Sequence, residues 1–270
     1  MVLDLLFHGT TRRSLIIESH YRRMMSRTIA IWKPKGPTSH DIVDTVRRIT
    51  GERTVGHAGT LDPMAEGILV VGIGREATRR LHEVVAGEKE YVATIRLGAT
   101  SATDDAEGEI TPTPSHSPSQ GEGEKNITPT STFSPSQREG EYEGVGRTEI
   151  ERILNQFVGC IKQIPPMYSA VKLRGVPAYK LARRGTPIIL KPREVEIKKI
   201  EITNYAWPEL HLHVICGPGV YIRALARDIG AALGTGGYLT ALTRTRVGIF
   251  TASESTTLDG LARSLASKRT

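Results

Sequence analysis

Two segments with alternating hydrophobic residues constrain the fold of this chain more than any other feature. Tyr91 to Leu97 (YVATIRL) and Glu209 to Cys216 (ELHLHVIC) both alternate with a period of two. This period is typical of strands that bury one face and expose the other. The apolar run GILVVGI from Gly67 indicates a buried strand, and TIAIW from Thr28 a further one. The chain is therefore predicted to build on a β-sheet.

Two amphipathic helices are indicated beside these strands. Thr38 and Asp41 can form a capping box for the first helix, which is predicted to end at Gly51. The apolar positions at helical spacing are Ile42, Val43, Val46 and Ile49 in the first helix, and Ile222, Leu225, Ile229 and Leu233 in the second. Strands outnumber helices and their connections are irregular. We therefore expect an α+β fold, with a mixed, mainly antiparallel sheet flanked by helices rather than a doubly wound sheet.

The composition changes sharply between residues 106 and 146. Ser, Thr, Pro and Gly make up 22 of these 41 residues, and SPSQGEGE at Ser117 returns as SPSQREGE at Ser134. Such a composition buries too little apolar surface to offset the entropy of ordering the chain. We predict that 106–146 is a disordered low-complexity insert within a folded domain spanning 28–250.

The N-terminal end of the chain also looks separable from that domain, and a short tail follows the domain at the C-terminal end. Residues 1–27 lack a core-forming pattern and are expected to be an unstructured N-terminal extension. Met24 or Met25 is an alternative natural start, and a transit peptide is a weaker alternative. Residues 251–270 are expected to be a short C-terminal tail containing one short helix.

Charge and cysteine content narrow the function classes. The chain carries a formal charge of +7, and the 106–146 segment holds seven acidic and two basic residues, a net of −5, which leaves +12 on the remainder. This surplus favours a polyanionic partner, either nucleic acid or an anionic membrane face. The longest apolar run is too short to span a membrane. Cys160 and Cys216 lack metal-ligand spacing and make no disulfide scaffold, so a reducing cytoplasm is expected and no metal site is predicted.

Several polar residues have both a structural and a functional interpretation. Asp62 lies in the glycine-rich stretch RTVGHAGTLDPMAEG, where an Asp-Pro turn alone would explain it. Arg223, at the start of the second helix, can reach a cleft and pair with a buried carboxylate, which keeps that carboxylate ionised. Arg227, one turn later, is expected to be a basic edge that faces solvent or phosphate. Tyr91 is either an edge aromatic or a platform for a base, and His57 either bonds within its loop or assists base extrusion.

Six blocks of the sequence together resemble a known enzyme family. The blocks are KPKGPTSHDIV, GHAGTLDPMAEGILVVGIGREATR, KEYVATIRLG, IPPMYSAVKLRGVPAYKLAR, GPGVYIRALARDIG and YLTALTRTRVGIF. In this order they resemble the signature blocks of the TruB-type tRNA pseudouridine synthases, and they span Lys33 to Phe250. The resemblance implies the pseudouridine synthase catalytic fold for 28–250. Many relatives continue into a PUA-type RNA-binding domain, and no full domain of that type is expected here.

The resemblance also implies roles for individual residues. The aspartate of GTLDP, Asp62, would be the catalytic carboxylate, and Arg223 would pair with it. Tyr91 would stack on the target base and assist proton removal from its C5 atom. The remaining implied residues are Tyr221, His57 and Leu242 in substrate binding, with His57 holding the extruded nucleotide and Leu242 walling the base pocket, and Lys33, Pro34 and Gly59 in support of the site.

The implied activity is isomerisation of uridine-55 in the TΨC loop of tRNA. An ionised carboxylate can attack C1′ or take a proton from C2′, so no metal or organic cofactor is expected, and the choice between these steps stays open. The expected partner is the T stem-loop of tRNA, with no membrane and no protein partner, for a chain that acts as a cytoplasmic monomer. The alternatives are a guide-RNA-dependent pseudouridine synthase relative and a non-catalytic protein that binds or folds tRNA.

Overall fold

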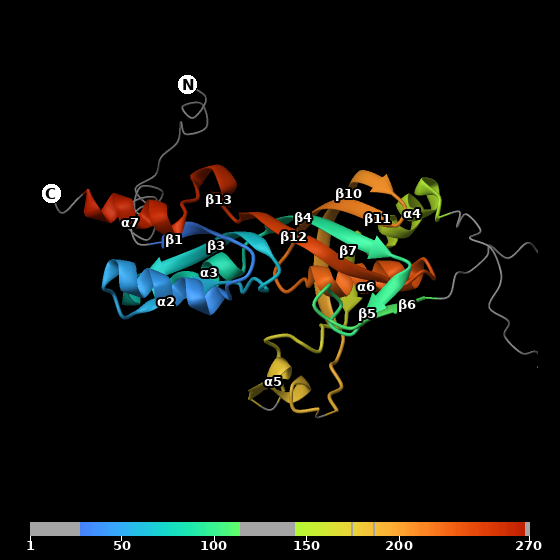
Figure 1. Cartoon of the computed structure of the whole chain (residues 1–270), viewed down its shortest axis with the longest axis horizontal. Coiled ribbons are helices and arrows are strands. Elements are labelled where there is room, and N and C mark those ends of the chain that lie inside the picture. Colours follow the sequence, from blue (N-terminus) through green and yellow to red (C-terminus); the bar gives the residue numbers. More distant parts are fainter. Residues whose placement is uncertain (1–27, 114–143, 174, 186, 268–270) are drawn as a thin grey trace, which may run out of the picture.

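A nine-stranded sheet forms the centre of the molecule (Figure 1). The computed structural model describes residues 28–113, 144–173, 175–185 and 187–267. The strand order in the sheet is β1-β3-β12-β4-β11-β10-β7, with β2 paired to β3 and β13 paired to β12. The strands are β1 (Thr28–Lys33), β2 (Val55–Ala58), β3 (Glu66–Ile73), β4 (Lys89–Leu97), β7 (Gly159–Gln163), β10 (Arg193–Ala206), β11 (Glu209–Cys216), β12 (Gly237–Val247) and β13 (Phe250–Thr251).

The sheet is mixed but mainly antiparallel, as the sequence predicts. Every pairing in it is antiparallel except that of β12 with β3, where Thr243 lies opposite Glu66 and Arg244 opposite Gly67. The helices flank this sheet, so the predicted fold class is confirmed. Because β12 lies between β3 and β4, it joins the part of the sheet near β1 to the part near β10 (Figure 1).

The larger core lies under the half of the sheet that contains β4 and β11. The alternation in these strands buries one face of each, including Ile95 in β4 and Leu212 in β11, which are both fully buried. Helix α6 (Ile222–Ala232) packs Leu225 and Ile229 into the same core. Burying each such side chain stabilises the fold by about 1.5–3 kcal/mol relative to leaving it exposed, so these strands need a covered apolar face.

A second core lies between the other half of the sheet and the helix α2 (Ser39–Thr50). The predicted capping box is present, since Thr38 accepts from the Asp41 backbone N–H and Asp41 accepts from the Thr38 backbone N–H. The helix ends at Gly51, whose φ of 72° is left-handed. Val46 of α2 packs here against β1 and β3. Helix α3 (Arg75–Val85) packs against β2 and β3.

The segment after β13 is joined to this second core. The Thr256 backbone exchanges hydrogen bonds with Ala30 at 3.0 Å and Trp32 at 2.9 Å, both in β1. The short helix predicted there is α7 (Leu258–Ala266), preceded by η2 (Ala252–Glu254). Thr257 caps the N-terminus of α7, and Leu258 and Leu261 of this helix pack on the core beneath α2. Residues 251–267 therefore pack on the same folded body as β1.

The remaining elements are short and lie around the far half of the sheet. They are β5 (Ala99–Ser101), β6 (Ile110–Pro112), α4 (Arg147–Leu154), η1 (Asn155–Phe157), β8 (Lys172–Leu173), β9 (Val176–Pro177) and α5 (Ala178–Ala182). The segment that carries α5 projects away from the sheet as a lobe (Figure 1).

One predicted boundary is corrected by these elements. The range 106–146 was expected to be disordered throughout, yet residues 106–113 are ordered and contain β6, which pairs with β5. The Thr113 backbone N–H also donates to Gly98 O at 3.0 Å. Cross-strand bonds satisfy the backbone here, and composition does not reveal them because few side chains are involved. The predicted extension 1–27 and residues 114–143 lie outside the described residues.

Candidate active site

Asp62 lies in the loop between β2 and β3, and its backbone is held from two directions. Ser39 Oγ donates to Leu61 O at 3.0 Å and accepts from the Leu61 N–H at 2.9 Å. The Ala65 N–H donates to Asp62 O at 3.1 Å, which closes the expected turn. The Asp62 side chain is nevertheless 34% exposed. The loop thus presents a fixed, partly exposed carboxylate, and the expected turn is present.

Arg223, in the first turn of α6, holds that carboxylate from two sides. Its Nη2 donates to Asp62 Oδ1 at 3.1 Å, and its Nε lies 2.9 Å from Oδ2. The same guanidinium donates to the backbone oxygens of Thr103 at 3.1 Å and Tyr168 at 2.9 Å. The Nη2 contact is a charge-assisted hydrogen bond and the Nε contact an ion pair, and together they restrict the orientation of the carboxylate. Arg223 is itself only 5% exposed, so the pair is anchored in the core.

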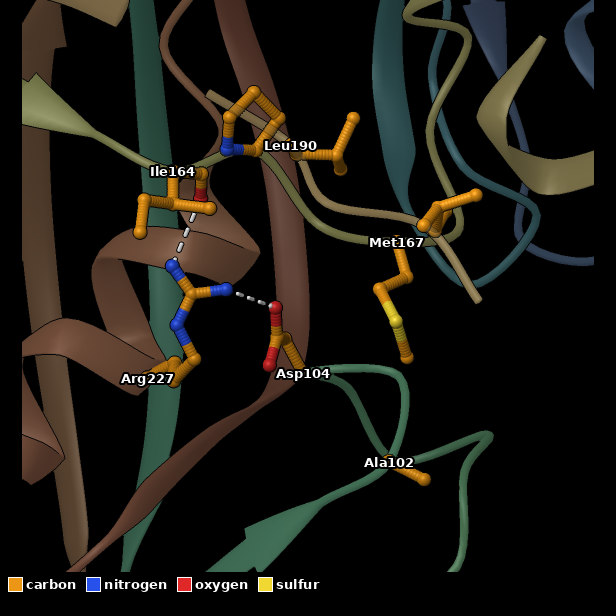
Figure 2. Close-up of a pocket in the computed structure, with 8 residues that line it drawn as sticks. Ala102, Asp104, Ile164, Met167, Leu190 and Arg227 are labelled. Atoms are coloured by element: carbon orange, nitrogen blue, oxygen red, sulfur yellow. Dashed lines mark hydrogen bonds and ion pairs between the residues drawn. The ribbon is translucent and has the colours of Figure 1, made fainter. Parts of the chain in front are cut away.

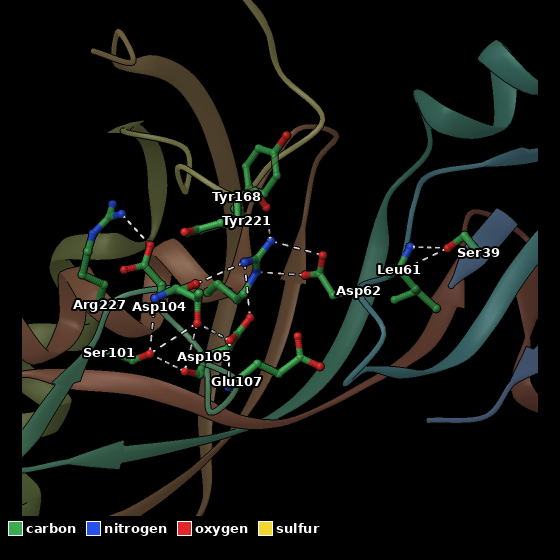
Figure 3. A network of polar contacts seen from close by, with 12 residues as sticks. Ser39, Leu61, Asp62, Ser101, Asp104, Asp105, Glu107, Tyr168, Tyr221 and Arg227 are labelled. Carbon is green, nitrogen blue, oxygen red and sulfur yellow. Dashed lines mark hydrogen bonds and ion pairs between the residues drawn. The ribbon is translucent and has the colours of Figure 1, made fainter. Parts of the chain in front are cut away.

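A second carboxylate, Asp105, was missed by the sequence reasoning. It is buried, and its Oδ2 accepts from Arg223 Nη1 at 3.2 Å (Figure 3). Its Oδ1 accepts from Thr103 Oγ1 at 2.5 Å and from the Glu107 N–H at 3.1 Å. Asp104 before it adopts a left-handed φ of 61°. The signal that could have found Asp105 is the pair of adjacent acids just after the strand YVATIRL in an otherwise basic chain.

The groups around Asp62 shift the pKa of its carboxyl in opposite directions. Burial raises the pKa of the Asp62 carboxyl above the ordinary 3.8, and the negative charge of Asp105 adds to this effect. Arg223 and Lys33 lower the same pKa through their positive charges. The carboxylate therefore depends on its two cationic neighbours to stay ionised.

Lys33 and Pro34 lie beneath the Asp62 loop. The Lys33 side chain is fully buried, and its Nζ donates to Pro34 O and Pro37 O at 2.8 Å and to Pro63 O at 3.4 Å. Burial lowers the pKa of Lys33 to about 8, against the opposing effect of Asp62. Lys33 therefore ties the residue after Asp62 to the end of β1, while Pro34 supplies an acceptor and is itself exposed.

Tyr91 and Leu242 lie in the core below the same loop. They belong to adjacent strands, β4 and β12, and share a cluster with Leu61. Tyr91 is 6% exposed and Leu242 5%, so in this structure the tyrosine ring is packed rather than free. Burial raises the pKa of the Tyr91 hydroxyl, a nearby Arg244 lowers it, and Asp62 is among its charged neighbours. The structure thus places Tyr91 close to Asp62.

Tyr221 and His57 lie on different sides of the site. The Tyr221 backbone exchanges two hydrogen bonds with the Gln163 side chain, at 2.9 and 3.1 Å. Burial raises the pKa of the Tyr221 hydroxyl, and the charges of Asp62 and Arg223 shift it in opposite directions. His57, in β2, is half-buried, and burial followed by the charges of His40 and Arg244 lowers its pKa. Its Nδ1 is buried and has no partner within the described chain. Tyr221 is thus brought to the Asp62–Arg223 pair, whereas no contact of His57 with Asp62 is seen among the described residues.

Arg227, expected at a basic edge that faces solvent or phosphate, is 31% exposed and bonded to neighbouring groups. It donates to Asp104 Oδ2 and to Ile164 O, each at 2.8 Å (Figure 2). It also pairs with Asp228 at 2.9 Å. These contacts form one wall of a pocket of about 260 Å³. Its other lining residues are Ala102, Pro165, Met167, Ile188 and Leu190. Arg227 therefore links α6 to two loops, because carboxylates and a carbonyl are within its reach.

Other site types find little support in the described residues. That part of the chain contains no cluster of three or more His, Cys, Asp or Glu side chains close enough to hold a metal ion. Cys160 and Cys216 are both free, and burial raises the pKa of the Cys216 thiol to about 12. None of the helices it contains combines the length and apolarity needed to cross a membrane.

Comparison with known proteins agrees with this geometry. The family model for the N-terminal domain of TruB family pseudouridylate synthases matches residues 47–132 and 124–222. The model for the tRNA pseudouridylate synthase B C-terminal domain matches residues 223–270. The chain is 43% identical over 247 residues to a tRNA pseudouridine synthase B of Thermobifida fusca (strain YX), covering 88% of this chain and 75% of the relative. It is 43% identical over 249 residues to one of Arthrobacter sp. (strain FB24), covering 90% and 72%.

Solved structures show the same relationship at lower identity. A chain of a Cbf5-Nop10-Gar1 complex superimposes with a TM-score of 0.62 and 27% identity, covering 90% of this chain and 55% of that chain. A chain of an H/ACA RNP bound to a substrate RNA containing 2′-deoxyuridine gives 0.58 and 26%, covering 92% and 55%. This chain thus spans just over half the length of those two. From its fold, its paired aspartate and these matches, the chain belongs to the TruB family of pseudouridylate synthases.

Proposed function

We propose that this chain isomerises uridine to pseudouridine in tRNA, at position 55 of the TΨC loop. The observation that carries the proposal is the contact of Asp62 with Arg223, in which a partly exposed carboxylate is aimed by a buried guanidinium. The curated relatives are tRNA pseudouridine synthases B and cover most of the chain. Pure RNA binding needs no carboxylate among phosphates, so the pair favours catalysis over binding alone.

The reaction rearranges one nucleotide without changing its composition. The bond between C1′ and N1 breaks, the uracil rotates, C1′ bonds to C5, and the proton from C5 is released as N1 regains one. Asp62 can assist as a nucleophile at C1′ or as a base at C2′, and both roles require its ionised form. Arg223 keeps it ionised and aimed, Leu242 walls the base pocket, and Tyr91 contacts the base and assists loss of the C5 proton.

The reaction requires a uridine that has left its stack, because C1′ and C5 are otherwise covered. Glycines around Asp62 let the backbone approach RNA closely, and Gly59 adopts a φ of 75° that favours glycine. His57, on the neighbouring strand, would help to hold the extruded nucleotide.

Contacts to RNA phosphates are expected from the lobe that carries α5. It begins beside the site, since Tyr168 O accepts from Arg223. Its exposed basic residues, with the adjoining start of β10, are Lys172, Lys180, Arg183, Arg184, Lys191 and Arg193. A basic surface next to an extruded base suits the stem of the T-arm. Affinity should therefore fall steeply as salt is raised.

The test is release of tritium from tRNA transcribed with uridine tritiated at C5. Purified chain without any added RNA guide should release close to one equivalent of tritium per tRNA, and a tRNA with cytidine at position 55 should release none. Release that requires an added guide RNA would favour the guide-dependent alternative. Tight binding without release would favour a non-catalytic RNA-binding protein.

We also propose that the chain acts as a monomer in the cytoplasm without a protein partner. Its free cysteines are compatible with a reducing compartment. Light scattering during active turnover should give the monomer mass. An activity that appears only on adding a cell fraction would contradict this.

A further inference from the structure

Arg244, in β12, is a buried cation with an unusual set of partners. It is 1% exposed, and no acidic side chain of the described chain lies within ion-pair distance of it. Its Nε donates to Ile68 O at 2.8 Å and its Nη2 to Gly59 O at 2.9 Å. Burying a charge without a counter-ion is costly, so the two carbonyls it binds are its main compensation.

Those two carbonyls bracket the loop that carries Asp62. Gly59 precedes Asp62 by three residues, and Ile68 follows it by six. One planar guanidinium therefore ties the beginning of the loop to its end. A lysine would have to reach both carbonyls from one nitrogen, whereas arginine donates from two separate nitrogens of a rigid plane.

The backbone of Arg244 closes the same loop from a third direction. It lies opposite Gly67 in the pairing of β12 with β3, the only parallel strand pairing in the described part of the sheet. A Cβ added to Gly67 would lie 2.2 Å from Arg244 O, so β3 and β12 approach here more closely than any side chain allows. Arg244 thus contacts Gly59, Gly67 and Ile68 at once.

Arg244 also joins this loop to Tyr91. The two residues face each other across β12 and β4. Burial raises the pKa of the Tyr91 hydroxyl, and the positive charge of Arg244 opposes this effect. A register shift follows directly, between Arg244 and Arg246. It turns Arg246 to the other side, where Arg246 pairs with Glu88 and Glu90 at 25% exposure.

We infer that Arg244 is a positioning residue, which holds the 59–68 loop and Tyr91 in register so that Asp62 meets the reacting nucleotide. The inference rests on the proposed function. Arg244 touches neither the substrate nor Asp62 and acts through the backbone it binds. A small displacement of Asp62 lowers the rate without weakening RNA binding, because affinity comes from other surfaces.

The test compares Arg244→Lys and Arg244→Met with two controls. Arg246→Met removes the neighbouring arginine of the same strand. Val46→Ala opens a cavity in the α2 core and serves as a control for lost stability, since Val46 is fully buried in a cluster that contains no residue of the 59–68 loop. For each variant, single-turnover tritium release is measured at saturating T-arm RNA, together with the dissociation constant and the melting temperature.

Arg244→Lys should slow single turnover at least about 30-fold, or ~2 kcal/mol. The dissociation constant should stay within about threefold, and both controls should keep their rate within about threefold. A normal rate in Arg244→Lys, a loss matched by Val46→Ala at equal stability, or a loss confined to RNA affinity would overturn the inference. If Arg244→Met does not fold, Arg244→Lys decides. A wild-type chain that releases no tritium would instead overturn the proposed function, and this inference with it.

Discussion

Replacing Arg223 by methionine should be among the most damaging single changes in this chain. The substitution keeps the bulk of the side chain but removes its contacts to Asp62 and Asp105, and to the backbone oxygens of Thr103 and Tyr168. Asp105 has a side chain only 3% exposed, so its charge would be left without its arginine partner inside the protein. Breaking a buried pair in this way costs about 3–5 kcal/mol.

Arg227→Met is the matched control, one turn further along the same helix. Arg227 is 31% exposed and its partners Asp104 and Asp228 are 14% and 29% exposed, so solvent screens these pairs and compensates their loss. About 1 kcal/mol is expected there. Urea denaturation at neutral pH, with the slope of the transition held as a check, measures both losses.

The same pair of variants separates stability from catalysis. At a temperature where both are folded, Arg223→Met should slow single turnover by at least about 100-fold, or ~2.7 kcal/mol, because Asp62 loses its orientation. Arg227→Met should keep most of its rate. The reasoning fails if Arg223→Met costs no more stability than Arg227→Met, or if it turns over at a near-normal rate.

Three further outcomes follow from the same structure. Turnover needs ionised Asp62, whose pKa lies above 3.8, so the rate should fall as pH drops through that raised value. Lys33→Met lacks a charge that lowers this pKa, so its rate should begin to fall at a higher pH than that of wild type. An unchanged pH–rate profile would contradict this. The pKa of Lys33 drops from 10.5 in the unfolded chain to about 8 in the fold, so between these pH values the unfolded state binds one more proton than the native state. From pH 8 to 10.5 the free energy of unfolding of wild type should therefore rise by about 3 kcal/mol relative to Lys33→Met, as measured by urea titration. Parallel stability curves for the two proteins would refute this. Gly67 and Gly36 both have a positive φ, of 110° and 105°, but only at Gly67 would an added Cβ lie against Arg244. Gly67→Ala should therefore lower the free energy of unfolding by at least about 2 kcal/mol more than Gly36→Ala does. Equal losses would count against the close approach of β3 to β12.

The local structure was largely predictable because its signals are short-range. The alternation in β4 and β11 fixes which face of each strand is buried. Thr38 and Gly51 mark the two ends of α2 through hydrogen bonds to neighbouring residues. Such signals involve residues a few positions apart, which a single sequence displays directly.

The parts that escaped prediction depend on contacts between distant segments. Asp105 contacts Arg223, which lies 118 positions away in the sequence. It directly precedes the low-complexity range, so the sequence pattern gave it no weight. Arg244 and Arg246 look alike in the segment TRTRV, and only the register shift against β4 buries one and exposes the other. Nothing in that short segment reveals the shift, because it is set by the pairing of two strands.

The site was predicted mostly through family resemblance, with residue patterns in support. From the residues alone, Asp62 could be explained as a turn, and Arg223 as an arginine that reaches some buried carboxylate. The structure brings the two together at 2.9 Å. The packed state of Tyr91, at 6% exposure, follows from its place between β11 and β12 and could not be read from its sequence position.

The central claim is that Asp62 performs chemistry on a uridine held by a basic surface. The most direct measurement is tritium release from a T stem-loop carrying uridine tritiated at C5, under single turnover, by wild type and Asp62→Asn, with the dissociation constant of each. Wild type should release the tritium, and the variant should be slower by at least about 1000-fold, or ~4 kcal/mol, with affinity within about threefold. Substantial release by Asp62→Asn would contradict the account.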